Sequence, residues 1–134
     1  MELASQESEK VHILVVEDEL LIAEWVAESL TEQGFDVRTA SNAGDALRQL
    51  ACEPIDVLFT DINLPGSMDG AALARRAREM QPNLPVIYAS ARVGTLAPEA
   101  RVPGAVVLGK PYGTEALGRV IYRAVQSAKR PAYA

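Results

Sequence analysis

Six side chains that can take part in chemistry stand where short apolar runs of the sequence end. They are three successive carboxylates, a fourth carboxylate, a hydroxyl and an ammonium: Glu17, Asp18, Glu19, Asp61, Ser90 and Lys110. Carboxylates that share one pocket repel one another, so one of them takes up a proton unless a cation binds there. The set contains hard oxygen ligands without a thiol or an imidazole, and this composition suits Mg²⁺.

A carboxylate beside such an ion has a further use, because it can attack phosphorus and form an aspartyl phosphate. The ion and the ammonium of Lys110 would neutralise charge on the phosphoryl oxygens during the transfer. Ser90 adds a neutral hydrogen-bond donor. The residue types therefore predict phosphoryl transfer at a magnesium site, provided that the fold brings them together.

The apolar runs that precede these residues have the length and composition of buried strands. They occupy five ranges: 11–16, 35–40, 55–60, 86–90 and 105–109. Because most are apolar throughout rather than alternating, both faces of the sheet are expected to be covered, as in a parallel sheet with helices on each side. Right-handed crossovers then bring every loop after a strand to one edge, where ligands bind in such folds.

Helical periodicity separates the runs, so we expect a doubly wound α/β domain. The predicted helices are 20–33, 42–51, 71–81 and 115–128. Gly34 is expected to end the first helix, and Ser41 and Thr114 are expected to cap the second and the last. The connection 91–104 contains two glycines and two prolines, so any helix in it should be short.

One domain accounts for nearly the whole chain of 134 residues, a length that buries roughly two-thirds of the unfolded surface. We expect a flexible acidic arm over residues 1–10, a folded domain over 11–128 and a polar tail over 129–134.

The charge of the chain is unevenly divided. Residues 1–37 hold ten acids and one base, which gives −9, whereas residues 38–134 hold eight acids and twelve bases, which gives +4. A net acidic chain without a basic stripe is a poor nucleic-acid binder. No apolar run approaches the roughly 18–20 residues that span a bilayer, and the first residues are not expected to form a signal peptide. With Cys52 as its single cysteine, the chain is expected to be cytoplasmic.

Taken in order, the residues at the strand ends resemble those of the receiver domain of two-component response regulators. The motifs that carry the resemblance are VVEDE (15–19), TDINLPGSMDG (60–70), the hydroxyl in YASA (88–91) and GKPY (109–112). The resemblance covers residues 11–128 and implies the flavodoxin-like strand order 2-1-3-4-5.

The resemblance also assigns a metal site and a phosphorylation site. Asp61 corresponds to the phosphorylated residue. Glu17 and Asp18 correspond to the acid pair that holds Mg²⁺, and the backbone carbonyl of Asn63 to a further metal ligand.

Three more residues take roles from the resemblance. Ser90 matches the switch hydroxyl, and Lys110 matches the lysine that contacts the phosphate. The peptide bond between Lys110 and Pro111 is expected to be cis.

The sequence departs from the common receiver pattern in three places. The loop after Asp61 is one residue longer at Gly66-Ser67. Val107 stands where receivers often carry a tyrosine or phenylalanine, which turns inward when the switch hydroxyl moves to the phosphate. The connection 91–104 is proline-broken, so the usual fourth helix is expected to be reduced. With the LPGSMDG and KPY motifs, these features resemble a subgroup of atypical receivers of bacterial general stress signalling.

The function implied is that of a phospho-accepting signalling domain. It would take a phosphoryl group from a histidine kinase or a histidine phosphotransfer protein, as in a phosphorelay, and switch protein–protein interactions. Phosphotransfer and autodephosphorylation would be self-catalysed, so the chain is not expected to be an enzyme for a separate substrate. One alternative is an interaction module that works without phosphorylation. Another is a phosphatase with an aspartyl nucleophile, although Asn63 stands where such enzymes commonly carry a second aspartate.

A ladder of acids on the first predicted helix suggests a partner surface. Glu24, Glu28 and Glu32 recur every four residues with no basic partner on that helix, and Leu20 and Leu21 precede them. One interpretation is a solvated face. The other is a surface that docks a basic helix of a partner kinase.

Overall fold

The computed structural model describes residues 10–91 and 98–129 of the chain. The arm predicted over 1–10 therefore lies outside the described residues except for Lys10. The last helix includes Lys129, which the sequence assigned to the tail, and the rest of that tail also lies outside.

Five parallel strands form one sheet in the order β2-β1-β3-β4-β5, which confirms the predicted topology. The strands are β1 (His12–Val16), β2 (Asp36–Ala40), β3 (Val57–Asp61), β4 (Val86–Ser90) and β5 (Val106–Gly109). Val16 is paired with Thr60, and Ser90 is paired with Gly109. The strands thus end nearly level, which brings the residues that follow them to one edge.

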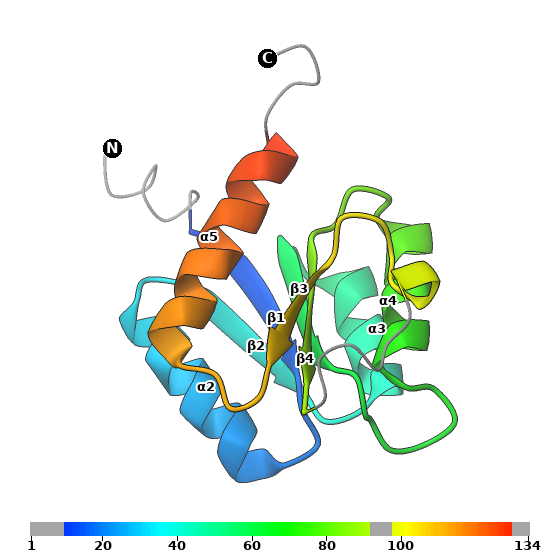
Figure 1. The fold of residues 1–134 in the computed structure, drawn as a ribbon, viewed down its shortest axis with the longest axis horizontal. Coiled ribbons are helices and arrows are strands. Elements are labelled where there is room, and N and C mark those ends of the chain that lie inside the picture. Colours follow the sequence, from blue (N-terminus) through cyan, green and yellow to red (C-terminus); the bar gives the residue numbers. More distant parts are fainter. Residues whose placement is uncertain (1–9, 92–97, 130–134) are drawn as a thin grey trace.

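Helices cover both faces of the sheet (Figure 1). They are α2 (Leu20–Glu32), α3 (Ala43–Cys52), α4 (Gly70–Met80) and α5 (Thr114–Lys129). The pair α2 and α5 lies on one face, and the pair α3 and α4 lies on the other. No helix in the described ranges is both long and apolar enough to cross a bilayer.

Each face of the sheet has its own apolar core. On the face of α2 and α5, Val26 and Ile121 pack against side chains of β1 and β3. On the face of α3 and α4, Leu73 and Tyr88 belong to the second core. Met80 is 45% exposed, although its spacing predicts an inward side chain, because α4 ends at this residue.

The helix caps differ in part from the predictions. Asn42, not Ser41, caps α3, because its side-chain oxygen is the one that accepts a hydrogen bond from the backbone N–H of Asp45 (2.8 Å). Thr114 is the first residue of α5 rather than the residue before it. Asp69 caps α4.

The connection between β4 and β5 carries one short 3₁₀ turn in its described part, η1 (Pro98–Ala100). This agrees with the expectation of a reduced helix, although residues 92–97 lie outside the described chain. Val102, just after the turn, is buried against the core on the α4 side.

Candidate metal centre at the sheet edge

Four elements bring the predicted residues to one edge of the sheet. Glu17 directly follows β1, Asp61 and Ser90 are the last residues of β3 and β4, and Lys110 directly follows β5. Of these, Glu17, Asp61 and Ser90 are buried. Because buried polar groups need partners, their contacts indicate what the site does.

Asp61 lies between an ammonium and a backbone amide. Its Oδ2 is 2.7 Å from Nζ of Lys110, and its Oδ1 accepts a hydrogen bond of 3.1 Å from the backbone N–H of Asn63. The Asp61 side chain is 8% exposed and that of Lys110 is 29% exposed. These two contacts hold the Asp61 carboxylate in one orientation at this edge of the sheet.

Three of the four predicted acids form a cluster. One carboxylate oxygen each from Glu17, Asp18 and Asp61 lie within 4.8 Å of one another. With the ammonium of Lys110 alongside, the formal charge is 1 − 3 = −2. Three carboxylates in a site of this net charge fit Mg²⁺, which binds through one or two carboxylates and keeps several waters. The residues present therefore fit the ion that the sequence implied.

Glu19 lies outside this cluster, although the sequence grouped it with the other acids. The backbone N–H of Glu19 donates a hydrogen bond of 3.0 Å to Oε2 of Glu17, and Glu19 is the N-cap residue of α2. Glu19 thus helps to orient Glu17 through its backbone.

Burial raises the pKa of Glu17, because the charged form loses water. The hydrogen bond from the Glu19 amide and the charge of Lys110 lower this pKa, while the charges of Asp61 and Asp18 raise it further. The net shift is upward. A cation bound beside Glu17 would oppose this shift, because it favours the charged form of the carboxyl.

The pKa of Lys110 is affected by opposing influences. Burial lowers it, but the hydrogen bond and charge of Asp61, together with the charges of Glu17 and Glu19, outweigh burial and leave the pKa raised. Lys110 is therefore a fixed positive charge at neutral pH.

The other predicted residues lie at the same edge. Asn63 is exposed just beyond Asp61, and the backbone carbonyl of Ser90 accepts a hydrogen bond of 2.8 Å from the backbone N–H of Lys110. The peptide bond between Lys110 and Pro111 is cis, as expected.

Gly70 is a site residue that sequence reasoning missed. Its backbone N–H donates to the carbonyl of Ile62 (2.7 Å), which brings the start of α4 against the residues that follow β3. A Cβ atom at Gly70 would lie 2.1 Å from the carbonyl oxygen of Asp61. In the sequence, Gly70 ends the TDINLPGSMDG motif and directly follows the cap Asp69, but it was given no role of its own.

Three aromatic side chains, Phe59, Trp25 and Tyr112, pack together beside the site on the α2 side. Sequence reasoning did not assign them a role at the site. The rings of Trp25 and Tyr112 lie 6.3 Å apart, and the rings of Phe59 and Tyr112 meet edge to face at 5.5 Å. Trp25 and Tyr112, with Ile22, Lys110 and Pro111, line a hollow of about 370 Å³.

The predicted partner surface is exposed. Leu20 is 69% and Leu21 is 79% exposed, and Trp25 is 49% exposed on the same helix. Glu24 and Glu28 are also exposed. These exposed apolar and acidic side chains thus all lie on α2.

Comparison with known proteins agrees with this arrangement. A family model, the response regulator receiver domain, matches residues 13–122. The response regulator receiver protein CpdR of Brucella abortus (strain 2308) is 35% identical over 102 residues, which are 75% of this chain and 84% of CpdR. The sensor histidine kinase RcsC of Escherichia coli is 35% identical over 88 residues, which are 66% of this chain but 9% of RcsC.

Solved structures give the same result. The response regulator receiver protein from Sinorhizobium medicae WSM419 superimposes with a TM-score of 0.84 at 30% identity, over 90% of this chain and 98% of that one. The receiver domain protein from Clostridium thermocellum has a TM-score of 0.80 at 31% identity, over 89% and 97%. Fold, strand-end residues and relatives together make this chain a member of the response regulator receiver domain family.

Proposed function

We propose that the chain accepts a phosphoryl group on Asp61 in a Mg²⁺-dependent reaction and thereby switches its contacts with other proteins. The observation that carries this proposal is the position of the Asp61 carboxylate, 2.7 Å from the ammonium of Lys110 and inside the cluster of three acids. The contacts with Lys110 and the Asn63 amide orient this carboxylate, whose side chain is 8% exposed.

In the proposed step a carboxylate oxygen of Asp61 attacks phosphorus, and the bond from phosphorus to the donor breaks. With a phosphohistidine donor, the imidazole nitrogen leaves with the electron pair. The ammonium of Lys110 and the hydroxyl of Ser90 would stabilise the phosphoryl oxygens. Bound Mg²⁺, held by Glu17, Asp18, Asp61 and the backbone carbonyl of Asn63 in the implied ligand set, would supply further neutralising charge.

The test is to incubate the chain with acetyl phosphate and MgCl₂ and to weigh the intact protein. We expect the mass of one added phosphoryl group on the wild type and none on Asp61→Asn. Asp69→Asn is the matched control, because an asparagine can still cap α4 and Asp69 lies outside the acid cluster. Equal labelling of wild type and Asp61→Asn, or no labelling of either, would rule out the proposal.

The proposed donor is a histidine kinase or a histidine phosphotransfer protein, and the proposed location is the cytoplasm. Similarity to a part of the sensor histidine kinase RcsC supports a place in such signalling. The same chemistry is self-catalysed, so we propose that the chain does not act as an enzyme on a separate substrate. The phosphatase alternative remains disfavoured, because an asparagine follows Asp61 by two residues.

The proposed docking surface for the donor is the exposed part of α2. Leu20 and Leu21 would bury apolar area, and Glu24 and Glu28 would attract a basic helix. Reversal of both charges, Glu24→Lys with Glu28→Lys, should slow transfer from the kinase in a salt-dependent way and leave labelling by acetyl phosphate unchanged.

A charge change elsewhere serves as the control for this surface. Glu79→Lys alters an exposed acid of α4, on the opposite face of the sheet. An equal loss of transfer in this variant, or an unchanged rate in the α2 double variant, would contradict the docking surface while leaving phosphorylation of Asp61 intact.

A further inference from the structure

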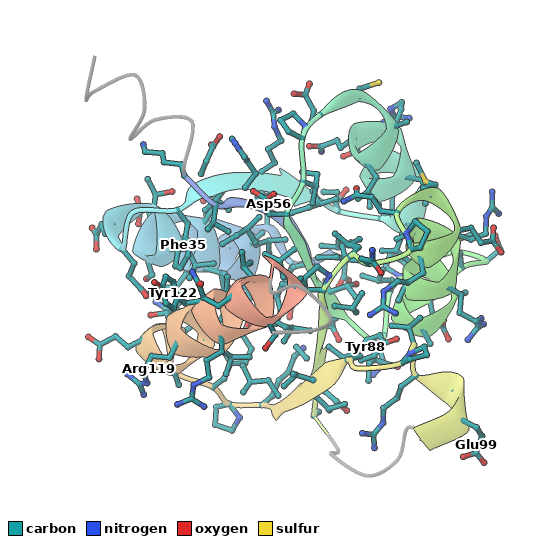
Figure 2. All side chains as sticks on the ribbon, turned by 90° about the horizontal axis from the view of Figure 1, so that it is seen from above. Phe35, Asp56, Tyr88, Glu99, Arg119 and Tyr122 are labelled. Carbon is teal, nitrogen blue, oxygen red and sulfur yellow. The ribbon has the colours of Figure 1, made fainter. Side chains whose placement is uncertain are left out.

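The fully buried side chain of Tyr88 connects the sheet to the chain between β4 and β5. Tyr88 lies in β4, and its hydroxyl oxygen accepts a hydrogen bond of 3.2 Å from the backbone N–H of Val102. Val102 is 6% exposed, so the loss of this acceptor would leave a buried donor without its partner. Figure 2 shows Tyr88 beside the chain that leads from η1, marked by Glu99, into β5.

Residues 98–104, here called the η1 segment, are also held from α4. A guanidinium nitrogen of Arg75 donates to the carbonyl of Ala100 (3.4 Å), and Nη2 of Arg78 donates to the carbonyl of Pro103 (2.8 Å). These bonds join the segment to a helix. Tyr88 instead joins it to the strand that carries Ser90.

Tyr88 and Ser90 lie on the same face of β4, because side chains alternate along a strand and the two residues are two positions apart. In the parallel register Tyr88 is paired with Val107 of β5. Val107 occupies the position at which receivers often carry the aromatic switch residue. This chain therefore has an aromatic hydroxyl at the same level of the sheet, but on the neighbouring strand.

We propose that Tyr88 is the residue through which phosphorylation of Asp61 reaches the η1 segment, an inference that rests on the function proposed above. Once Asp61 is phosphorylated, the Ser90 hydroxyl donates a hydrogen bond to a phosphoryl oxygen and draws the end of β4 toward Asp61. Tyr88 moves with the strand, and its hydroxyl parts from the N–H of Val102. The hydrogen bonds from Arg75 and Arg78 of α4 to the segment remain.

Release of the segment changes an exposed surface. Gly104, its last residue, and Val106 of β5 line a hollow of about 430 Å³, together with Val120 and Arg123 of α5. A shift of the segment moves one wall of this hollow.

The test compares amide hydrogen exchange in the η1 segment with and without acetyl phosphate and MgCl₂. In the unphosphorylated wild type the Val102 amide should exchange slowly, and in Tyr88→Phe roughly tenfold faster, as expected for the loss of one hydrogen bond. Phosphorylation should raise the wild-type rate toward that of the variant and leave Tyr88→Phe unchanged. Tyr122→Phe, which removes the hydroxyl of an exposed tyrosine on α5, should behave as the wild type.

A second variant separates coupling from a merely structural contact. Ser90→Ala keeps Tyr88 and Val102 but removes the hydroxyl that responds to the phosphoryl group. Phosphorylated Ser90→Ala should therefore retain slow exchange at Val102. The same phosphorylation-induced rise in Tyr88→Phe or Ser90→Ala as in the wild type would overturn the inference.

Intact mass, measured on the same samples, distinguishes failure of the coupling through Tyr88 from failure of the proposed function. Phosphorylated wild type without a change at Val102 overturns the role of Tyr88 alone. Absence of the phosphoryl group from the wild type overturns the proposed function, and the coupling with it.

Discussion

The ammonium nitrogen of Lys110 lies 2.7 Å from Oδ2 of Asp61, across 49 positions of the chain. The contact is made because β3 and β5 end at the same edge of the sheet, on either side of β4. It leaves one positive charge beside three acids, so negative charge is in excess at this edge of the sheet.

Removal of the Lys110 ammonium should destabilise the protein. Lys110→Met leaves Asp61 and Glu17 buried without their counter-ion, and breaking a fully buried pair costs about 3–5 kcal/mol. Because Lys110 is 29% exposed, solvent screening reduces the cost, and we expect about 1–2 kcal/mol in the free energy of unfolding by urea. Lys10→Met, at an exposed position, should change it little. Equal effects of the two variants would contradict the importance of the pair.

Magnesium should stabilise the fold by binding the acid cluster. A ligand at about 100 times its dissociation constant adds about 2.7 kcal/mol to the stability. The midpoint of thermal unfolding should rise with MgCl₂ and not with NaCl of equal ionic strength. Asp18→Asn should abolish most of the rise, whereas Asp69→Asn should retain it, because Asp18 belongs to the cluster and Asp69 does not.

A side chain at Gly70 should disturb the site. In Gly70→Ala the added Cβ would lie 2.1 Å from the Asp61 carbonyl oxygen, so the backbone must shift, at a cost of about 1–3 kcal/mol. Phosphorylation by acetyl phosphate should slow as well. Gly44→Ala on α3 is the control, because its nearest contact would be an ordinary 3.5 Å and alanine favours the helix. A Gly70→Ala protein as stable and as reactive as Gly44→Ala would show that the close approach is unimportant.

The phenol of Tyr112 should lose its proton only at a pH well above the usual range for tyrosine. Burial, followed by the charges of Glu17 and Asp61, raises its pKa to about 12 from 10.0. Because the folded state holds this proton more tightly than the unfolded state, its contribution to stability is complete below pH 10 and is lost as the pH rises toward 12. Phenolate absorbance should show a group that titrates at about pH 12, and Tyr112→Phe should remove it.

The stability profile provides a second check on Tyr112. Lys110 also has a raised pKa, so part of the alkaline loss of stability will persist in Tyr112→Phe. The variant should nevertheless lose less stability than the wild type between pH 10 and 12. Identical profiles would mean that the phenol titrates normally.

The sequence by itself determined the strands and the residues at their ends, and its resemblance to receiver domains implied the order of the strands. This was possible because apolar runs and helical periods are local patterns, and because right-handed crossovers leave few arrangements for alternating strands and helices. Glu17, Asp61, Ser90 and Lys110 lie at one edge for that reason. Local patterns failed at the ends of elements, as with the Asn42 cap and the exposed Met80.

Only the tertiary structure decided which groups at and near the site are in contact. It separated Glu19 from the other acids, brought Gly70 against the backbone of Asp61, and joined the hydroxyl of Tyr88 to the amide of Val102. Such contacts depend on how far above the sheet the helices and connections pack, and a difference of a fraction of an ångström in that distance matters. The type and spacing of nearby residues do not determine this distance, because it results from the packing of the whole core.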